Sequence, residues 1–244
     1  MASPELFAST AGARALALET SALQKPQLWL GPLRGACASL LQPQELAWGR
    51  ALPPLQRRRY WQSRAALRRW LASLLGCAAE AVPLHSPPGA PPRLADDQLW
   101  ISLSHSGDGL LLGASRWPIG VDLEWAERPL AAAPLMRRFF PPQEVRQLEL
   151  LPAAALPAAV LTSWVLKEAA IKSRRGTLAA ELACWGWDHQ RQRLCDQRDD
   201  SSPEARWGAC DGWLWAAVGQ GAAAAELQPG PWEAALQAPA EARG

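Results

Sequence analysis

One stretch in the second half of the chain, Ser163 to Lys172, has the composition of a stable helix. It contains good helix formers and neither Gly nor Pro. Glu168 and Lys172 lie four residues apart, so their side chains point the same way. The chain has 25 Lys and Arg residues, but only Lys25, Lys167 and Lys172 are Lys. Two lysines this close in an Arg-rich chain indicate a need for compact ammonium groups, the alternative being an ordinary exposed Glu–Lys pair.

Length and charge narrow the class of protein. The 244 residues are 49% hydrophobic, which is enough for a sizeable core in one large domain or two small ones. Charged residues make up 20% of the chain and the net charge is +2. This balance gives no global field that would attract nucleic acid or a membrane.

Cysteine usage and the apolar runs point to a cytoplasmic protein. The five cysteines are odd in number and form no CxxC pair, so a disulfide framework and a zinc finger are both disfavoured. The N-terminus has no basic segment followed by an apolar run. The longest apolar run, residues 153–166, is too short to span a bilayer. We therefore expect reduced thiols, no signal peptide and no membrane span.

The N-terminal part predicts a strand at Leu28 to Leu30, a helix starting near Pro43 and a second helix over residues 57–75, ended by Gly76. Six arginines fall within residues 57–69 of the second helix. They are either a solvated face or a phosphate-binding face, because the Arg fork matches phosphate oxygens.

A hairpin is predicted after the Pro- and Gly-rich loop of residues 83–98. Residues 99–104 and 110–115 are its strands, and residues 105–109 form the turn. His105 stands at the end of the first strand, where site residues often collect. A structural histidine that caps the turn is the alternative.

The next predicted strand, residues 119–125, alternates cleanly between apolar and polar positions. Asp122 and Glu124 lie on one face of it, close enough to share a cation. Like charges so placed are costly unless something neutralises them, although a solvated strand face is the alternative.

The remaining segments complete the outline. A short helix from Met136, a Pro break, and a helix from near Pro142 precede an Ala/Pro linker at residues 152–158. Strands are expected at residues 184–187, 193–195 and 212–218. We divide the chain into an N-terminal half (1–117), a C-terminal half (118–228) and a disordered tail (229–244).

Three carboxylates define the predicted chemistry: Asp122, Glu124 and Glu168. Oxygen-only ligands favour Mg²⁺, with Mn²⁺ as a substitute. Lys172, His105 and the arginine cluster suit an anionic, phosphorylated substrate. The residues alone therefore predict a Mg²⁺-dependent phosphoryl or phosphodiester transfer site.

Four short motifs, in order, resemble those of the Sfp-type 4′-phosphopantetheinyl transferases. Two are the paired signatures Ile119-Gly-Val-Asp-Leu-Glu124 and Trp164-Val-Leu-Lys-Glu-Ala-Ala-Ile-Lys172. The others are Ile101-Ser-Leu-Ser-His-Ser106 and Arg138-Phe-Phe-Pro-Pro-Gln-Glu144. The similarity covers roughly residues 28 to 220, and the joint spacing of the motifs makes a chance match improbable.

The resemblance implies an α+β fold of two similar halves, a pseudo-dimer with coenzyme A in the cleft between them. It implies a monomeric enzyme that transfers 4′-phosphopantetheine from coenzyme A to a serine of an apo acyl or peptidyl carrier protein, releasing adenosine 3′,5′-bisphosphate. Asp122, Glu124 and Glu168 would hold Mg²⁺. Glu168 would help to deprotonate the serine, directly or through water, and Lys172 would neutralise charge on the attacked phosphate. Ser104 and His105 would bind phosphate oxygens, and Arg59 and Arg64 the adenosine 3′-phosphate end.

One departure affects the nucleotide end. Where the family commonly has Gly-Lys-Pro, this chain has Gly89-Ala90-Pro91. Arg93 is a candidate to replace the missing lysine, or the contact comes from elsewhere. Two other functions stay open: a Mg²⁺-dependent phosphohydrolase that uses water as acceptor, and a nucleic-acid-binding module that uses the arginine helix, which the near-neutral net charge disfavours.

Overall fold

The computed structural model describes residues 23–34, 38–95 and 97–230, and over these the chain is α+β, as predicted. Residues 231–244 of the predicted tail lie outside this range. The six-stranded sheet has the order β11-β1-β5-β4-β3-β2. Its strands are β1 (Gln27–Pro32), β2 (Leu84–His85), β3 (Arg93–Leu94), β4 (Trp100–Ser106), β5 (Gly109–Ser115) and β11 (Glu226–Pro229).

The C-terminal part forms a second sheet and a hairpin. The three-stranded sheet, in the order β6-β10-β9, contains β6 (Ile119–Trp125), β9 (Ala205–Cys210) and β10 (Trp213–Gly219). The separate hairpin pairs β7 (Trp185–Asp188) with β8 (Arg193–Asp196). The helices are α2 (Pro43–Arg50), α3 (Pro54–Leu75), α4 (Ala132–Phe139), α5 (Pro142–Glu149), α6 (Leu156–Ser173) and α7 (Leu178–Glu181).

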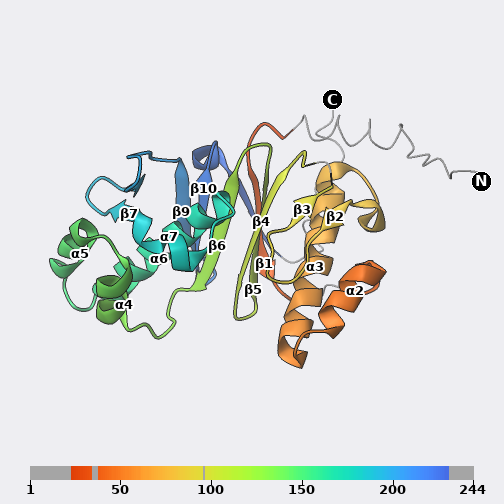
Figure 1. Cartoon of the computed structure of the whole chain (residues 1–244), viewed down its shortest axis with the longest axis horizontal. Helices are drawn as coiled ribbons and strands as arrows, with labels where there is room; N and C mark the ends of the chain where they lie inside the picture. Colours follow the sequence, from red (N-terminus) through yellow and green to blue (C-terminus); the bar gives the residue numbers. More distant parts are fainter. Residues whose placement is uncertain (1–22, 35–37, 96, 231–244) are drawn as a thin grey trace, which may run out of the picture.

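The two sheets lie side by side at the centre, with helices on both outer sides (Figure 1). Helix α3 packs on the six-stranded sheet through Leu67 and Leu71, against Ile101 and Leu112. Helix α6 covers the three-stranded sheet with an apolar face that includes Val165. Between the sheets, residues of β1, β5, β6 and β10 form a shared core. Strand β6, which carries Asp122 and Glu124, therefore lies at this junction.

Strand β6 confirms the predicted alternation. Ile119, Val121 and Leu123 are buried in the core between the sheets, while Asp122 and Glu124 face the other way, beside α6. The first face is apolar because it packs against another sheet, and the second can carry charge because its neighbours supply polar partners.

Helix α3 begins at Pro54, before the first arginine of the predicted range 57–75, and ends at Leu75 as predicted. Gly76 adopts the left-handed conformation (φ 64°) that terminates helices at low cost for glycine. The helix is not a uniformly solvated arginine face, because Arg68 is only 2% exposed and donates to Glu45 Oε2 at 2.7 Å. Arg68 therefore has a structural role.

Two expectations about the C-terminal part were wrong in detail. Helix α6 begins at Leu156, inside the predicted linker, because Pro157 occupies the first turn, where its missing N–H costs nothing. Strand β9 was not predicted, since Ala-Arg-Trp-Gly-Ala-Cys has little apolar alternation. Across the described ranges, no helix is long and apolar enough to cross a membrane.

Candidate active site

Three serines of β4 form hydrogen bonds with the neighbouring strand β6. Ser104 donates to Asp122 Oδ1 at 2.7 Å, and Ser106 donates to Glu124 Oε2 at 2.8 Å. Ser102 accepts a hydrogen bond from the Val121 N–H at 3.0 Å. Because the three alternate along one strand, they lie on one face and hold the end of β4 against the acidic edge of β6.

Helix α6 reaches the same place from the other side. The Lys172 Nζ lies 2.5 Å from Asp122 Oδ1, 3.6 Å from Glu168 Oε2 and 3.1 Å from Ser104 Oγ. Side chains from β4, β6 and α6 thus converge, although they are 68 residues apart at most in sequence. The predicted pair Glu168–Lys172 is therefore not an ordinary surface pair: the Glu168 side chain is only 13% exposed.

Burial and crowded negative charge together set the electrostatics of this cluster. Burial, followed by the nearby Asp122 and Glu124 carboxylates, raises the pKa of Glu168 to about 7, while Lys172 opposes the rise. Burial works against a charged Lys172, but Asp122 and Glu168 outweigh it and raise the pKa of the ammonium. The lysine is therefore held protonated between carboxylates.

The donor set fits a hard cation such as Mg²⁺, though its geometry is not that of a preformed metal site. Within the described residues, no three His, Cys, Asp or Glu side chains are arranged to hold a metal ion. Glu124 is paired with Arg128, at 2.5 Å, and Lys172 lies between the other two carboxylates. Yet Asp122 Oδ2 is buried without a hydrogen-bond partner, as a ligand oxygen would be before a cation binds.

A cavity of about 240 Å³ adjoins the cluster. Its walls come from both halves of the chain: the loop from Gly89 to Pro92, strand β4, and the end of α6. The cationic side chains that line it are Arg64, Lys172 and Arg175. Since Lys172 belongs to both the cavity and the acidic cluster, a ligand that fills the cavity would extend toward Asp122.

Of the predicted nucleotide contacts, Arg64 and Lys172 line this cavity, while Ser104, His105, Arg59 and Arg93 do not. Burial lowers the pKa of His105, and Arg59, Lys172 and Arg64 lower it further, which places these cations within electrostatic range of the imidazole. Arg64 is 7% exposed and donates to the Ser86 carbonyl at 3.2 Å. Arg59 and Arg93 are exposed and do not line the cavity.

The sequence did not single out several residues that complete this neighbourhood. Ser102 and Ser106 could have been found from the spacing of serines on β4, since alternate residues share a face. Arg128 lies four residues after Glu124. That spacing predicts an ion pair only within a helix, and Arg128 lies in the loop after β6. Arg175 follows the predicted helix and carried no motif of its own.

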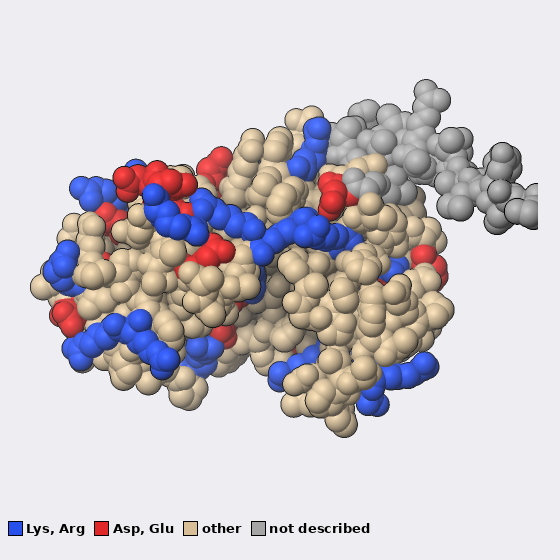
Figure 2. Space-filling view, in the orientation of Figure 1, with Lys and Arg blue, Asp and Glu red and all other residues tan. Residues whose placement is uncertain are grey.

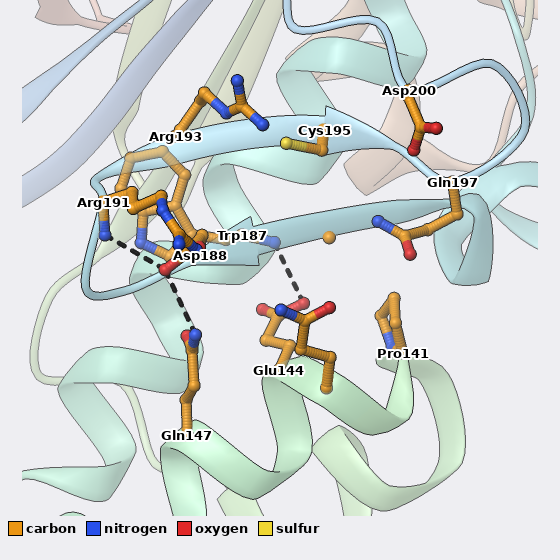
Figure 3. Close-up of a pocket in the computed structure, with 12 residues that line it drawn as sticks. Pro141, Glu144, Gln147, Trp187, Asp188, Arg191, Arg193, Cys195, Gln197 and Asp200 are labelled. Atoms are coloured by element: carbon orange, nitrogen blue, oxygen red, sulfur yellow. Dashed lines mark hydrogen bonds and ion pairs between the residues drawn. The ribbon is translucent and has the colours of Figure 1, made fainter.

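A second cavity, of about 170 Å³, lies between α5 and the β7–β8 hairpin (Figure 3). Glu144 and Gln147 point into it from α5, opposite Trp187, Asp188 and Cys195 of the hairpin. None of the predicted site residues lines it. Behind it, Glu144 Oε2 lies 2.6 Å from the Nζ of fully buried Lys167. Lys167 is thus part of a buried ion pair away from the cavity that Lys172 lines.

Comparison with known proteins agrees with the motifs. Residues 118–220, which carry Asp122, Glu124, Glu168 and Lys172, match the family model of the 4′-phosphopantetheinyl transferase superfamily. This part of the chain is therefore similar to members of that superfamily. A Synechocystis sp. protein named "Putative 4'-phosphopantetheinyl transferase" is 35% identical over 160 residues, which cover 62% of this chain and 65% of that protein.

Proposed function

We propose that this protein transfers 4′-phosphopantetheine from coenzyme A to a serine of an apo acyl or peptidyl carrier protein, with Mg²⁺, and releases adenosine 3′,5′-bisphosphate. The observation that carries the proposal is the meeting of Ser104, Asp122, Glu168 and Lys172 beside a cavity with cationic walls. A site with acidic and cationic groups side by side suits a substrate that binds through metal and phosphate together. We expect the protein to act as a cytoplasmic monomer.

In this proposal the acidic cluster holds the cation. Asp122, Glu124 and Glu168 would bind Mg²⁺, which when present neutralises the pyrophosphate of coenzyme A and polarises the phosphorus under attack. Glu124 must release Arg128 to take part, and that pair is partly exposed, with the Arg128 side chain 31% accessible. The Glu124 side chain itself is only 14% exposed, so the arriving cation would have to compensate for the lost pair.

In the proposed reaction, side chains of this protein accept the proton of the carrier serine and stabilise the charge that develops on the attacked phosphate. The serine oxygen of the carrier forms a bond to the phosphorus next to the pantetheine arm. The bond from that phosphorus to the bridging oxygen breaks, and adenosine 3′,5′-bisphosphate leaves. The serine proton passes to Glu168, directly or through a water molecule. Lys172, 3.1 Å from Ser104 Oγ, would place its ammonium against the phosphate oxygens as charge builds on them.

The nucleotide end is assigned to cations from the N-terminal half. His105 and Ser104 would contact phosphate oxygens, and Arg59, Arg64 and Arg93 would supply charge near the adenosine 3′-phosphate. If Arg59 were the residue that binds the 3′-phosphate, Arg59→Ala would raise the KM for coenzyme A about ten- to a hundredfold, as for loss of a charged hydrogen bond, with little change in kcat.

Intact-mass spectrometry tests the proposal. The protein, an apo carrier, coenzyme A and Mg²⁺ are incubated together, and the carrier should gain the mass of one phosphopantetheine. EDTA should abolish the gain. Carriers of several classes that all stay unmodified would contradict the proposal, and hydrolysis of a phosphorylated substrate without any carrier would favour the phosphohydrolase.

A further inference from the structure

Arg175 has an unusual place at the end of α6. It adopts φ 56°, in the left-handed region that glycine occupies freely and other residues only at a cost. Its N–H donates to the Lys172 carbonyl at 3.0 Å, so the backbone here closes the helix. A glycine would serve this turn better, which suggests that the arginine side chain has a use of its own.

The guanidinium of Arg175 is held in place but incompletely paired. Its Cζ lies 4.0 Å from the centre of the Trp100 ring, close enough for a cation–π contact. Its Nε is buried without a hydrogen-bond partner. Its ion-pair partner is Asp97, at 3.6 Å, and that carboxylate is 61% exposed. The side chain is thus preorganised, with donors still available.

The charge of Arg175 contributes to a cavity that already suits a phosphate ester. Arg175 and Ala90 both line the cavity, with Arg64 and Lys172 as the other cations in the wall. Lys and Arg side chains also gather on the surface along the junction of the two halves (Figure 2). A ligand whose pyrophosphate reaches Lys172 can therefore place a second phosphate beside Arg175.

We propose that Arg175 binds the 3′-phosphate of coenzyme A. The inference rests on the proposed function, because it takes coenzyme A as the ligand. A phosphomonoester offers oxygens spaced for the planar Arg fork, and the Trp100 ring fixes the plane of that fork. Arg59 and Arg93 are less suited to this role, since both are exposed and neither lines the cavity.

In this proposal, the Asp97 carboxylate pairs with Arg175 while the phosphate is absent. It neutralises Arg175 before the ligand arrives, through a contact longer than a hydrogen bond. The incoming phosphate must displace this carboxylate or lie beside it at a cost in repulsion. Removal of the Asp97 charge should therefore strengthen binding of the 3′-phosphate, which a purely structural role for Arg175 would not predict.

Isothermal titration calorimetry with the full chain tests the assignment by comparing coenzyme A with dephospho-coenzyme A, which lacks the 3′-phosphate. Arg175→Ala should weaken coenzyme A about ten- to a hundredfold and leave dephospho-coenzyme A within about twofold. Arg175→Lys should fall between, because it keeps the charge but loses the fork. Asp97→Asn should bind coenzyme A more tightly than wild type, with dephospho-coenzyme A unchanged.

Arg116→Ala is the matched control. Arg116 also lies over a tryptophan, 5.9 Å from the Trp117 ring, but it is exposed and outside the cavity. It should bind both ligands as wild type does. Arg59→Ala and Arg93→Ala are measured in the same way.

The outcomes separate this inference from the function on which it rests. If wild type binds neither ligand, the proposed function is overturned as well. If wild type prefers coenzyme A but Arg175→Ala weakens both ligands equally, only the role of Arg175 is overturned. A loss specific to coenzyme A in Arg59→Ala or Arg93→Ala, but not in Arg175→Ala, would assign the 3′-phosphate to that residue instead.

Discussion

Gly120 of β6 and Ala169 of α6 are in direct backbone contact. A Cβ atom on Gly120 would lie 1.9 Å from the Ala169 carbonyl oxygen and 2.3 Å from the Ser173 backbone nitrogen. Backbone atoms of a packed helix cannot swing aside as the end of a side chain can. This contact sets the separation of strand and helix, and through it the distance from Asp122 to Lys172.

Gly120→Ala should therefore damage both the fold and the site. The added methyl group forces β6 and α6 apart, which we expect to lower the free energy of unfolding by about 1–3 kcal/mol. Transfer to the carrier should fall further than the loss of folded protein explains, because Asp122 moves away from Lys172. Urea unfolding and the intact-mass assay measure the two effects.

Gly208→Ala provides the control. Gly208 lies in β9 of the same sheet, where a Cβ would meet the Trp215 side chain at an ordinary 3.4 Å. This variant should keep near-normal stability and transfer. Full activity in Gly120→Ala would mean that the close contact does not position the site.

Much of this geometry was predictable because the decisive patterns are local. The alternation in residues 119–125 gave β6 and its acidic face, and Pro142 and Gly76 marked helix ends through backbone rules that hold in any fold. Asp122 and Glu168 were grouped because carboxylate oxygens suit one hard cation, and the motif resemblance supported that grouping. Periodicity alone does not say which helix covers which strand.

Other features depend on tertiary contacts that no local pattern encodes. Arg64 and Arg68 belong to one arginine-rich helix, yet both are buried, because Ser86 and Glu45 approach from elsewhere. Strand β11 pairs in parallel with β1, about 200 residues away in sequence, so the first sheet is completed by the C-terminal part. The proposed role of Arg175 could not be predicted from the sequence either, because the cavity that it lines is assembled from both halves of the chain.

Removal of an acidic ligand should abolish turnover without unfolding the protein. Asp122→Ala and Glu168→Ala should each reduce transfer by about a hundredfold or more, because both would position the cation and the pyrophosphate. Glu168→Ala removes one of several crowded carboxylates, so its melting temperature should stay close to that of wild type. Asp122→Ala also removes a partner of Ser104 and Lys172, so it should fold but melt at a lower temperature. Activity is measured across a Mg²⁺ series, and melting by circular dichroism.

A surface carboxylate serves as the comparison for these variants. Glu226 pairs with Lys25 in the open, both side chains being 54% exposed, and Glu226→Ala should change neither quantity. Near-normal transfer by Asp122→Ala or Glu168→Ala at limiting Mg²⁺ would refute the metal role of that residue.

The buried pair Glu144–Lys167 should matter for stability. Lys167 is fully buried, 3.4 Å from the centre of the Phe140 ring, and burial lowers its pKa to about 8 against the attraction of Glu144. Lys167→Met would leave Glu144 buried without its cation, at a cost of about 3–5 kcal/mol in the free energy of unfolding. The double variant with Glu144→Gln should recover much of that loss.

An exposed ion pair serves as the control for the stability measurements on Glu144–Lys167. Arg137 and Glu149 are 64% and 45% exposed, so Arg137→Ala should cost less than about 1 kcal/mol. Urea unfolding of the single and double variants yields the coupling energy of the buried pair. A double variant no more stable than Lys167→Met would show that the cost comes from lost packing and not from an unpaired charge.

Low pH should destabilise the folded protein because His189, which lies beside the Glu144–Lys167 pair, has a lowered pKa. Burial, followed by the charge of Lys167, lowers the pKa of His189 to about 4 from an ordinary 6.5. Between these two pH values, His189 is protonated in the unfolded chain but stays neutral in the folded protein. The free energy of unfolding therefore falls as the pH drops from about 6.5 to about 4, and the stabilisation is fully present above that window.

His189→Gln should reduce this pH dependence, because glutamine cannot titrate. The groups around the imidazole are Ser163 and Lys167 from α6, Glu144 from α5, and the adjacent Asp188. Glu144 has a raised pKa, so its own titration opposes the trend and is common to both proteins. Urea midpoints of wild type and variant are compared at pH 7 and pH 4.5. The gap between the two pH values should be smaller in the variant, and an equal gap would mean that His189 is free to protonate in the folded protein.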